Sequence, residues 1–274
     1  MPDGIEAIEI NLLLEAVFMR YGHDFRNYAL SSIERRIRNF LPKSGCRTIS
    51  EMISRVLHDE DFFRQLLQAF SITVTGLFRD PPVFCSLREH VVPILRTYPT
   101  FKVWIAGCAT GEEAYSFAIL LMEEGIYERA TIYATDFNDE ALAKAKEGIY
   151  PIDYIKKFTS NYHEAGGVMP FSSYYHARYN AIAMNRSLKE NITFANHNLV
   201  TDSVFGEMHL IICRNVFIYF DLKLQDRVLN LFQESLVYGG YLCLGISEDL
   251  RFSAVREKFE KVDEDTRVFR KRRS

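Results

Sequence analysis

The stretch "VWIAGCATGEEAYSFAILLMEE" (Val103–Glu124) has the pattern of a buried β-strand, a glycine turn and a helix. Such a turn normally holds a nucleotide phosphate, because the free N–H groups of a helix N-terminus attract anions. Here Glu112 and Glu113 occupy the first turn of the helix, where phosphate oxygens would have to lie. Two carboxylates oppose a pyrophosphate and favour a cation. S-adenosylmethionine, with its adenosine, positive sulfur and ammonium group, therefore fits this turn.

The pattern continues on both sides of this stretch. Short strands are expected at 101–107, 131–137, 191–199, 208–215 and 240–247. One helix begins near Glu112 between the first two strands, and Asn138 or Asp139 can cap the next helix. Strands that alternate with helices predict an α/β fold with a doubly wound, mostly parallel sheet.

The chain divides into three parts. Apolar residues recur at helical spacing from Ile8 to Ala69, which predicts an all-α domain at 1–70. Residues 71–82 are expected to form a linker, and residues 83–274 the α/β domain. A stretch at about 159–190 is rich in Tyr, Ser and Gly without a period, which indicates an insertion. The closing "RKRRS" is interpreted as a solvated basic tail.

Composition limits the function further. With 274 residues and a net charge of −3, the chain is large enough for two domains and is not a general nucleic-acid binder. Its five cysteines are scattered without a C-x-x-C pair, which favours reduced thiols in a cytoplasm and argues against a metal site. No leader and no apolar run of roughly 18 residues is present, so we expect a cytoplasmic protein without membrane insertion.

Candidate ligand residues follow the predicted strands. Gly107 opens the glycine turn, and Asp136 lies 25 positions beyond Gly111, where a carboxylate can accept both ribose hydroxyls. Asp136 could instead cap the next helix. The run "IICRNVFIYFD" places Arg214, Asn215 and Tyr219 after another strand, where polar groups line a ligand cleft. Arg214 could instead be a structural ion-pair partner, and Tyr219 a core residue.

The helix "LSSIERRIRNFL" (Leu30–Leu41) carries Arg35, Arg36 and Arg38, with Ile33 and Ile37 on its buried side. For an arbitrary helix, such arginines form a solvated face.

Three segments together resemble the CheR family of chemotaxis receptor methyltransferases, over nearly the whole chain. They are "GCATGEEAYSFAILL", "ATDFNDEALAKAKEGIY" and "CRNVFIYFD…GGYLCLGISE". The resemblance implies an S-adenosylmethionine-dependent protein-glutamate O-methyltransferase, acting on the cytoplasmic helices of methyl-accepting chemotaxis receptors and releasing S-adenosylhomocysteine. It also implies an N-terminal helical domain, a linker that contacts the cofactor, a methyltransferase domain at 83–274 and a small inserted β-subdomain. We further expect a monomer.

The resemblance also implies roles for single residues. "SITVTGLFRD" matches the family's linker, which implies cofactor contacts at Thr73, Thr75 and Arg79, the last suited to the cofactor's carboxylate. The other implied cofactor residues are Gly107, Glu113, Asp136, Asn198, Leu199, Arg214 and Asn215. Tyr219 matches a tyrosine near the methyl-transfer centre, and with Arg214 forms the implied catalytic pair. Because the family's arginine helix faces the acidic receptor helix, the resemblance favours docking by Arg35, Arg36 and Arg38 over the solvated face.

This chain departs from the family pattern at Thr73, Gly76, Leu77 and Ile246, while Ser32 and Glu34 dilute the arginine cluster. Methylation of a glutamate requires no general base, since the side chain is ionised at pH 7. Two other functions remain open on the residues. An NAD-dependent oxidoreductase would share the fold but lacks the pyrophosphate fingerprint. A non-catalytic relative could bind S-adenosylmethionine or a partner without turnover.

Overall fold

The structure is a computed structural model that describes residues 4–70, 75–263 and 265–273. The chain forms two compact units. The first comprises the described residues of Met1–Ile72 together with Phe217–Arg227, and the second those of Thr73–Val216 and Val228–Ser274. No sequence pattern distinguishes Phe217–Arg227 from its neighbours, so its membership of the helical unit is a finding of the structure.

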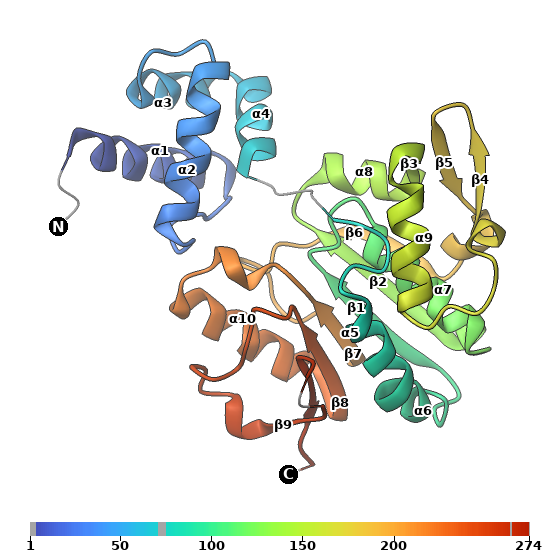
Figure 1. Ribbon diagram of the computed structural model, residues 1–274. Helices are drawn as coiled ribbons and strands as arrows, with labels where there is room; N and C mark the ends of the chain where they lie inside the picture. The colour runs from blue at the N-terminus through green and yellow to red at the C-terminus, as the bar shows by residue number, and fades with distance from the viewer. Residues whose placement is uncertain (1–3, 71–74, 264, 274) are drawn as a thin grey trace. The chain divides into compact units, whose positions relative to one another are not determined.

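The first unit contains the expected N-terminal all-α domain (Figure 1). Its described helices are α1 (Ile5–Tyr21), α2 (Leu30–Phe40), α3 (Ile49–His58) and α4 (Glu60–Phe70). The helix ends follow local chemistry: α1 ends at Gly22 in the left-handed conformation, and the Thr48 side chain accepts a hydrogen bond from Glu51 N at the start of α3. Ile33 and Ile37 of α2 are fully buried, as their spacing predicted.

The second unit is built on a mixed sheet which, in the described residues, has seven strands in the order β6-β2-β1-β7-β8-β10-β9 (Figure 1). The strands are β1 (Phe101–Ala106), β2 (Ala130–Asp136), β6 (Ile192–Asn196), β7 (Met208–Cys213), β8 (Leu236–Leu244), β9 (Phe259–Lys261) and β10 (Val268–Lys271). Neighbouring strands from β6 to β8 are parallel, whereas β10 runs antiparallel to β8 and β9. The predicted doubly wound parallel sheet is therefore confirmed, with an antiparallel edge.

Helices cover both faces of this sheet, as the alternation of side chains along β1 requires. Val103 and Ile105 pack into the main core, whereas Trp104 faces Phe232 of α10 with ring centroids 5.2 Å apart. The helices of this unit are α5 (Pro81–Ser86), α6 (Val92–Leu95), α7 (Glu112–Glu123), α8 (Asp139–Glu147) and α9 (Ile155–Glu164), and α10 (Leu222–Ser235) continues into it from the helical unit. Short helical turns lie at Leu41–Lys43, Leu87–Val91, Tyr127–Arg129, Ile152–Tyr154, Phe171–Tyr174, Arg186–Lys189, Phe217–Tyr219 and Arg256–Lys258.

The inserted β-subdomain is an antiparallel sheet of order β3-β5-β4, formed by β3 (Ile149–Pro151), β4 (Tyr175–Arg178) and β5 (Ala181–Met184). Its first strand precedes the expected start at residue 159, because Tyr and Pro at 150–151 give no distinct signal. Glu123, at the end of α7, anchors the insertion by accepting hydrogen bonds from Tyr162 and Tyr174 while it pairs with Arg88.

The sequence interpretation of "RKRRS" as a solvated tail is wrong for its first two residues. Arg270 and Lys271 end strand β10, and the Lys271 ammonium is buried and donates to the carbonyl oxygens of Gln233 and Leu236 at 2.6 and 2.7 Å. A lysine head is tolerated there because backbone carbonyls satisfy its donors. No helix in the described part of the chain is long and apolar enough to span a bilayer.

Candidate functional site

The glycine turn between β1 and α7 needs its glycines. Gly107 and Gly111 have φ values of 75° and 93°, which side chains rarely adopt. A Cβ atom at Gly107 would lie 2.6 Å from Cγ2 of Val216, and one at Gly111 would lie 2.9 Å from Cβ of Ala145. The turn therefore lets β1, α8 and the residues after β7 approach one another closely.

Asp136, at the end of β2, is tied to this turn. Its Oδ2 accepts a hydrogen bond from Ala109 N at 2.9 Å, and its Oδ1 accepts one from Asn138 N at 3.0 Å. Burial raises the pKa of the carboxyl group, and both of these donors are uncharged. The cap of α8 is instead Asn138, whose side chain accepts from Glu140 N and Ala141 N. Asp136 is thus not the helix cap, and each of its oxygens keeps capacity for a further donor.

Glu113 belongs to a charged network around Arg214. The guanidinium of Arg214 donates to Oε1 of Glu113 at 2.6 Å and to Oδ2 of Asp80 at 2.7 Å. Its side chain is only 3% exposed. Burial acts to lower the pKa of Arg214, but Glu113 and Asp80 help to reverse the effect, and the pKa is raised. Arg214 is therefore an ion-pair partner, positioned between the start of α7 and the linker.

Glu112 takes the other carboxylate position of the turn. It is 6% exposed, and its Oε2 accepts a hydrogen bond from the Thr110 hydroxyl at 2.6 Å. Burial raises its pKa to about 6. The helix start thus holds two acidic groups in different surroundings: Glu113 is paired with an arginine, whereas Glu112 is buried and accepts from a hydroxyl.

The described part of the linker, residues 75–82, contacts Arg214 and helix α7. Arg214 also donates to the carbonyl oxygen of Arg79 at 2.9 Å, and Phe78 N donates to the Ser116 hydroxyl of α7 at 2.8 Å. Phe78 and Asp80 both have positive φ values, of 52° and 56°, so this segment adopts a constrained path. The guanidinium side chain of Arg79 is 43% exposed. Thr75 is half-buried, and Thr73 lies outside the described residues.

The remaining expected cofactor residues follow β6 and β7. Asn198 donates its backbone N–H to Asp202 at 2.9 Å and accepts from Val200 N at 3.0 Å, while Leu199 is buried beside it. Asn215 has a φ of 60°, and its backbone N–H donates to Oε2 of Glu248 at 3.1 Å. Sequence reasoning missed Glu248, although an acidic residue just after a neighbouring parallel strand is a usable signal.

The topology brings most of these residues to one edge of the sheet. Strands β6, β2, β1 and β7 are adjacent and parallel, so the residues that follow them share the carboxyl-end edge. The strand order reverses between β1 and β7, and ligands of open α/β sheets bind at such a switch point. Gly107 and Arg214 directly follow these two strands.

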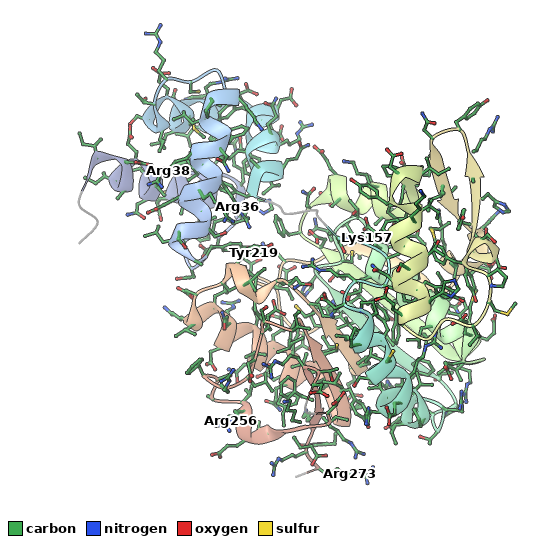
Figure 2. All side chains as sticks on the ribbon, in the orientation of Figure 1. Arg36, Arg38, Lys157, Tyr219, Arg256 and Arg273 are labelled. Carbon is green, nitrogen blue, oxygen red and sulfur yellow. The ribbon has the colours of Figure 1, made fainter. Side chains whose placement is uncertain are left out.

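Tyr219 lies in the helical unit, and its neighbour there is one of the predicted docking arginines (Figure 2). The Arg36 guanidinium carbon lies 4.5 Å from the centroid of the Tyr219 ring, and Arg36 is 6% exposed. The prediction that Arg36 docks a partner is therefore corrected, because its side chain faces inward. Arg35 and Arg38 are exposed, and Arg38 pairs with Glu6 and Glu34.

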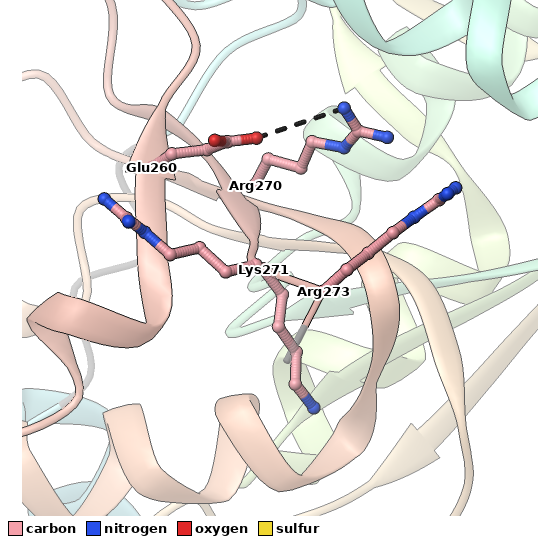
Figure 3. A pocket seen from close by; sticks show the side chains of 5 residues that line it. Glu260, Arg270, Lys271 and Arg273 are labelled. Atoms are coloured by element: carbon pink, nitrogen blue, oxygen red, sulfur yellow. Dashed lines mark ion pairs between the residues drawn. The ribbon is translucent and has the colours of Figure 1, made fainter.

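A hollow of about 420 Å³ lies at β9 and β10, the last two strands in the sheet order, which are separated from β7 by β8 (Figure 3). It is lined by Glu260, Arg270, Lys271, Arg272 and Arg273. Figure 3 marks the ion pair between Glu260 and Arg270, which measures 3.9 Å. None of the expected cofactor residues contributes to it, so it is not the candidate site.

Comparison with known proteins agrees with the two-part architecture. The family model described as "CheR methyltransferase, SAM binding domain" matches residues 73–268, and "CheR methyltransferase, all-alpha domain" matches residues 8–71. The chain is 52% identical over 264 residues to "Putative methyltransferase Cher3" of Pseudomonas putida, covering 96% of this chain and 97% of that protein.

Two more distant relatives carry a more specific name. A "Chemotaxis protein methyltransferase" of Listeria monocytogenes is 29% identical, with 84% of this chain and 85% of that protein covered. A protein of the same name from Borreliella burgdorferi is 28% identical, with 89% and 88% covered.

Proposed function

Since the chain belongs to the CheR methyltransferase family, we propose that it methylates glutamate side chains on the cytoplasmic helices of chemotaxis receptors. The family assignment makes it an S-adenosylmethionine-dependent methyltransferase. The products of the proposed reaction are glutamyl methyl esters and S-adenosylhomocysteine. The acceptor residue and the receptor are the parts of this proposal that go beyond the family.

One observation supports particular residues as the cofactor site. Ala109 N of the glycine turn donates a hydrogen bond of 2.9 Å to the Asp136 carboxylate. It sets a buried carboxylate beside the turn, with oxygens that can accept further donors. Ribose hydroxyls are such donors. Glu112 and Glu113 at the start of α7 add negative charge, which suits a sulfonium and opposes a pyrophosphate. The residues present therefore fit S-adenosylmethionine better than a dinucleotide.

The proposed roles follow from this fit. Asp136 would hold the ribose, Glu113 and the Arg214 network the amino-acid end, and Asn198 and Leu199 the adenine side. The Arg79 side chain is 43% exposed and its Nε lies 3.9 Å from Oδ2 of Asp80, and we propose that it also pairs with the cofactor's carboxylate. Thr75, Gly107 and Asn215 complete the proposed lining, and Thr73 is kept as an expectation from the linker motif.

The chain has little covalent chemistry to perform. When bound, S-adenosylmethionine supplies an activated methyl group, and a glutamate with an ordinary pKa near 4.3 is already a carboxylate at pH 7. The protein must hold the acceptor oxygen in line with the methyl carbon and exclude water, and such alignment can lower the barrier by about 7–11 kcal/mol. Tyr219 would orient the acceptor, while Arg214 holds Glu113 and the linker in place.

For the protein substrate, we propose that the exposed Arg35 and Arg38 of α2 meet acidic residues of the receptor helix. The acceptor helices of such receptors are cytoplasmic, which would place the reaction there. We expect a monomer that acts without nucleic acid or membrane insertion. A non-catalytic relative would bind the cofactor equally well and leave the receptor unlabelled.

The test is a labelling reaction. The purified chain is incubated with methyl-labelled S-adenosylmethionine and membranes that contain the receptors of the source cell. We expect a labelled receptor band whose label is released as methanol by mild base, as for a methyl ester. Heat-denatured protein serves as the control. A base-stable label would contradict the glutamate assignment, and cofactor binding without any label would favour the non-catalytic alternative.

A further inference from the structure

The three arginines of α2 have different surroundings, and Arg36 is the exception. Its Nη1 donates to the carbonyl oxygen of Phe70, the last residue of α4, and its guanidinium lies over the Tyr219 ring at 4.5 Å. Among the described residues no carboxylate pairs with Arg36, and its Nε and Nη2 have no hydrogen-bond partner there. Burial lowers the pKa of Arg36, while Tyr219 and Tyr28 act in the opposite direction. The Phe70 carbonyl oxygen and the face of the Tyr219 ring are therefore the two groups that receive this buried cation.

The main chain around Tyr219 is held by the same helical unit. Ala29 N donates to the carbonyl oxygen of Tyr219 at 2.8 Å, and Asp221 N donates to that of Asn27 at 3.0 Å. Tyr28 forms an isolated antiparallel bridge with Phe220, and their rings pack edge to face with centroids 5.1 Å apart. These contacts fix the backbone of the turn, and none of them involves the Tyr219 side chain. The guanidinium of Arg36 lies over that ring.

We propose that Arg36 is a positioning residue for Tyr219. Its guanidinium plane, held at the C-terminus of α4, selects the ring orientation that the methyl-transfer step uses. This inference rests on the proposed function, in which Tyr219 orients the acceptor. It separates the arginines of one helix into two roles: Arg35 and Arg38 face the solvent for docking, and Arg36 faces inward to order the tyrosine.

The geometry argues for positioning over docking. A docking arginine must present its donors to another protein, whereas only 6% of the surface of Arg36 is exposed. Its neighbour Arg35 is exposed. A planar guanidinium can stack over a ring while donating in its own plane, which a lysine ammonium cannot do. Arg36 donates to the carbonyl oxygen of Phe70 and places its guanidinium over the Tyr219 ring.

The experiment compares three variants of the full chain: Arg36→Met, Arg36→Lys and, as a matched control, Arg64→Met. Arg64 is an exposed arginine of α4 whose side chain is 56% exposed. Receptor methylation is measured as kcat and as KM for the receptor, and S-adenosylhomocysteine affinity by calorimetry. We expect Arg36→Met to lower kcat about tenfold or more, with both KM and the affinity within about twofold of wild type. Arg36→Lys should recover only part of kcat, and Arg64→Met should change none of these values.

A second measurement guards against a purely structural effect and against failure of the proposed substrate. A double-mutant cycle of Arg36→Met and Tyr219→Leu, read by urea unfolding, reports the stacking itself whether or not a receptor is methylated. We expect the two changes to be clearly non-additive.

Two results would overturn the inference. One is an unchanged kcat in Arg36→Met with a raised receptor KM, which is the behaviour of a docking arginine. The other is additive unfolding energies in the cycle, which would mean that Arg36 and Tyr219 do not interact. If the wild type labels no receptor, the proposed function fails, while the cycle still decides whether Arg36 orders the tyrosine.

Discussion

At the scale of single residues, Asp136 combines two tasks in one carboxylate. It accepts hydrogen bonds from Ala109 N and Asn138 N, and it is the proposed acceptor for the ribose. Removing the whole side chain would leave two backbone donors without their acceptor and would confuse binding with folding, since an unsatisfied buried group costs about 1–3 kcal/mol. Asparagine keeps one of the two acceptor oxygens, so it disturbs these backbone contacts less than alanine does.

We therefore predict that Asp136→Asn weakens S-adenosylhomocysteine binding roughly 100-fold, because hydrogen bonds to a charged acceptor are each worth about 1.5–3 kcal/mol. Calorimetry measures this directly. The thermal midpoint without ligand should fall less than in Asp136→Ala, because one backbone donor keeps its acceptor. An Asp136→Asn protein that binds S-adenosylhomocysteine as tightly as wild type would remove Asp136 from the ribose site.

The burial of Glu112 predicts how the free energy of unfolding depends on pH. Burial raises its folded-state pKa to about 6 from 4.5, so the folded protein holds this proton more tightly than the unfolded chain. The free energy of unfolding should therefore fall as pH rises from about 4.5 to 6, by about 2 kcal/mol in total. Glu112→Gln should remove this pH dependence. The free energy of unfolding of the variant, relative to that of wild type, should therefore rise by about 2 kcal/mol between pH 4.5 and pH 7.5. Urea unfolding at both pH values is the measurement, and an equal pH dependence in the two proteins would contradict the assignment.

At the scale of elements, helix α2 shows what its sequence could and could not predict. Ile33 and Ile37 correctly placed the buried side, and the spacing 33, 36, 37 and 40 already put Arg36 on that side with Phe40. The sequence interpretation placed Arg36 on the exposed side because of its charge, against the helical spacing. The carbonyl oxygen and the ring that contact its guanidinium belong to Phe70 and Tyr219, which are distant in the sequence. Periodicity predicts which side of a helix is buried, but not which distant groups make a buried charge tolerable.

The exposed side of α2 carries its own prediction. Arg35 is exposed, whereas Arg38 is already paired with Glu6 at 2.5 Å. We expect Arg35→Glu to raise the receptor KM strongly and to weaken the fall of the methylation rate with added salt, because screening acts on exposed charge pairs over roughly 8–10 Å. S-adenosylhomocysteine affinity should stay unchanged. Wild-type kinetics in the variant at low salt would make this side of α2 an ordinary solvated face.

At the scale of the whole molecule, local patterns predicted the sheet and most of the candidate site, because the residues concerned end or directly follow strong apolar strands. Gly107 and Arg214 directly follow such strands, and Asp136 is the last residue of one. The short, charged strands Phe259–Lys261 and Val268–Lys271 gave no such signal, since they form the antiparallel edge and rely on pairing with β8 and each other. Likewise, the membership of Phe217–Arg227 in the helical unit depends on contacts with Asn27, Tyr28 and Ala29, which no local window contains.

The sharing of Phe217–Arg227 leads to a prediction about unfolding. Helix α10 (Leu222–Ser235) begins in the helical unit and continues into the sheet unit from Val228 onward. Neither unit can unfold alone without breaking this helix, so we expect one cooperative thermal transition in calorimetry, where separable domains would give two. A ligand of the sheet unit must then shift the whole transition. S-adenosylhomocysteine at 100 times its Kd should add about 2.7 kcal/mol to the free energy of unfolding, and NAD at the same concentration should add nothing. An early transition that S-adenosylhomocysteine leaves in place would show that the helical unit unfolds by itself and that the shared helix does not couple the two.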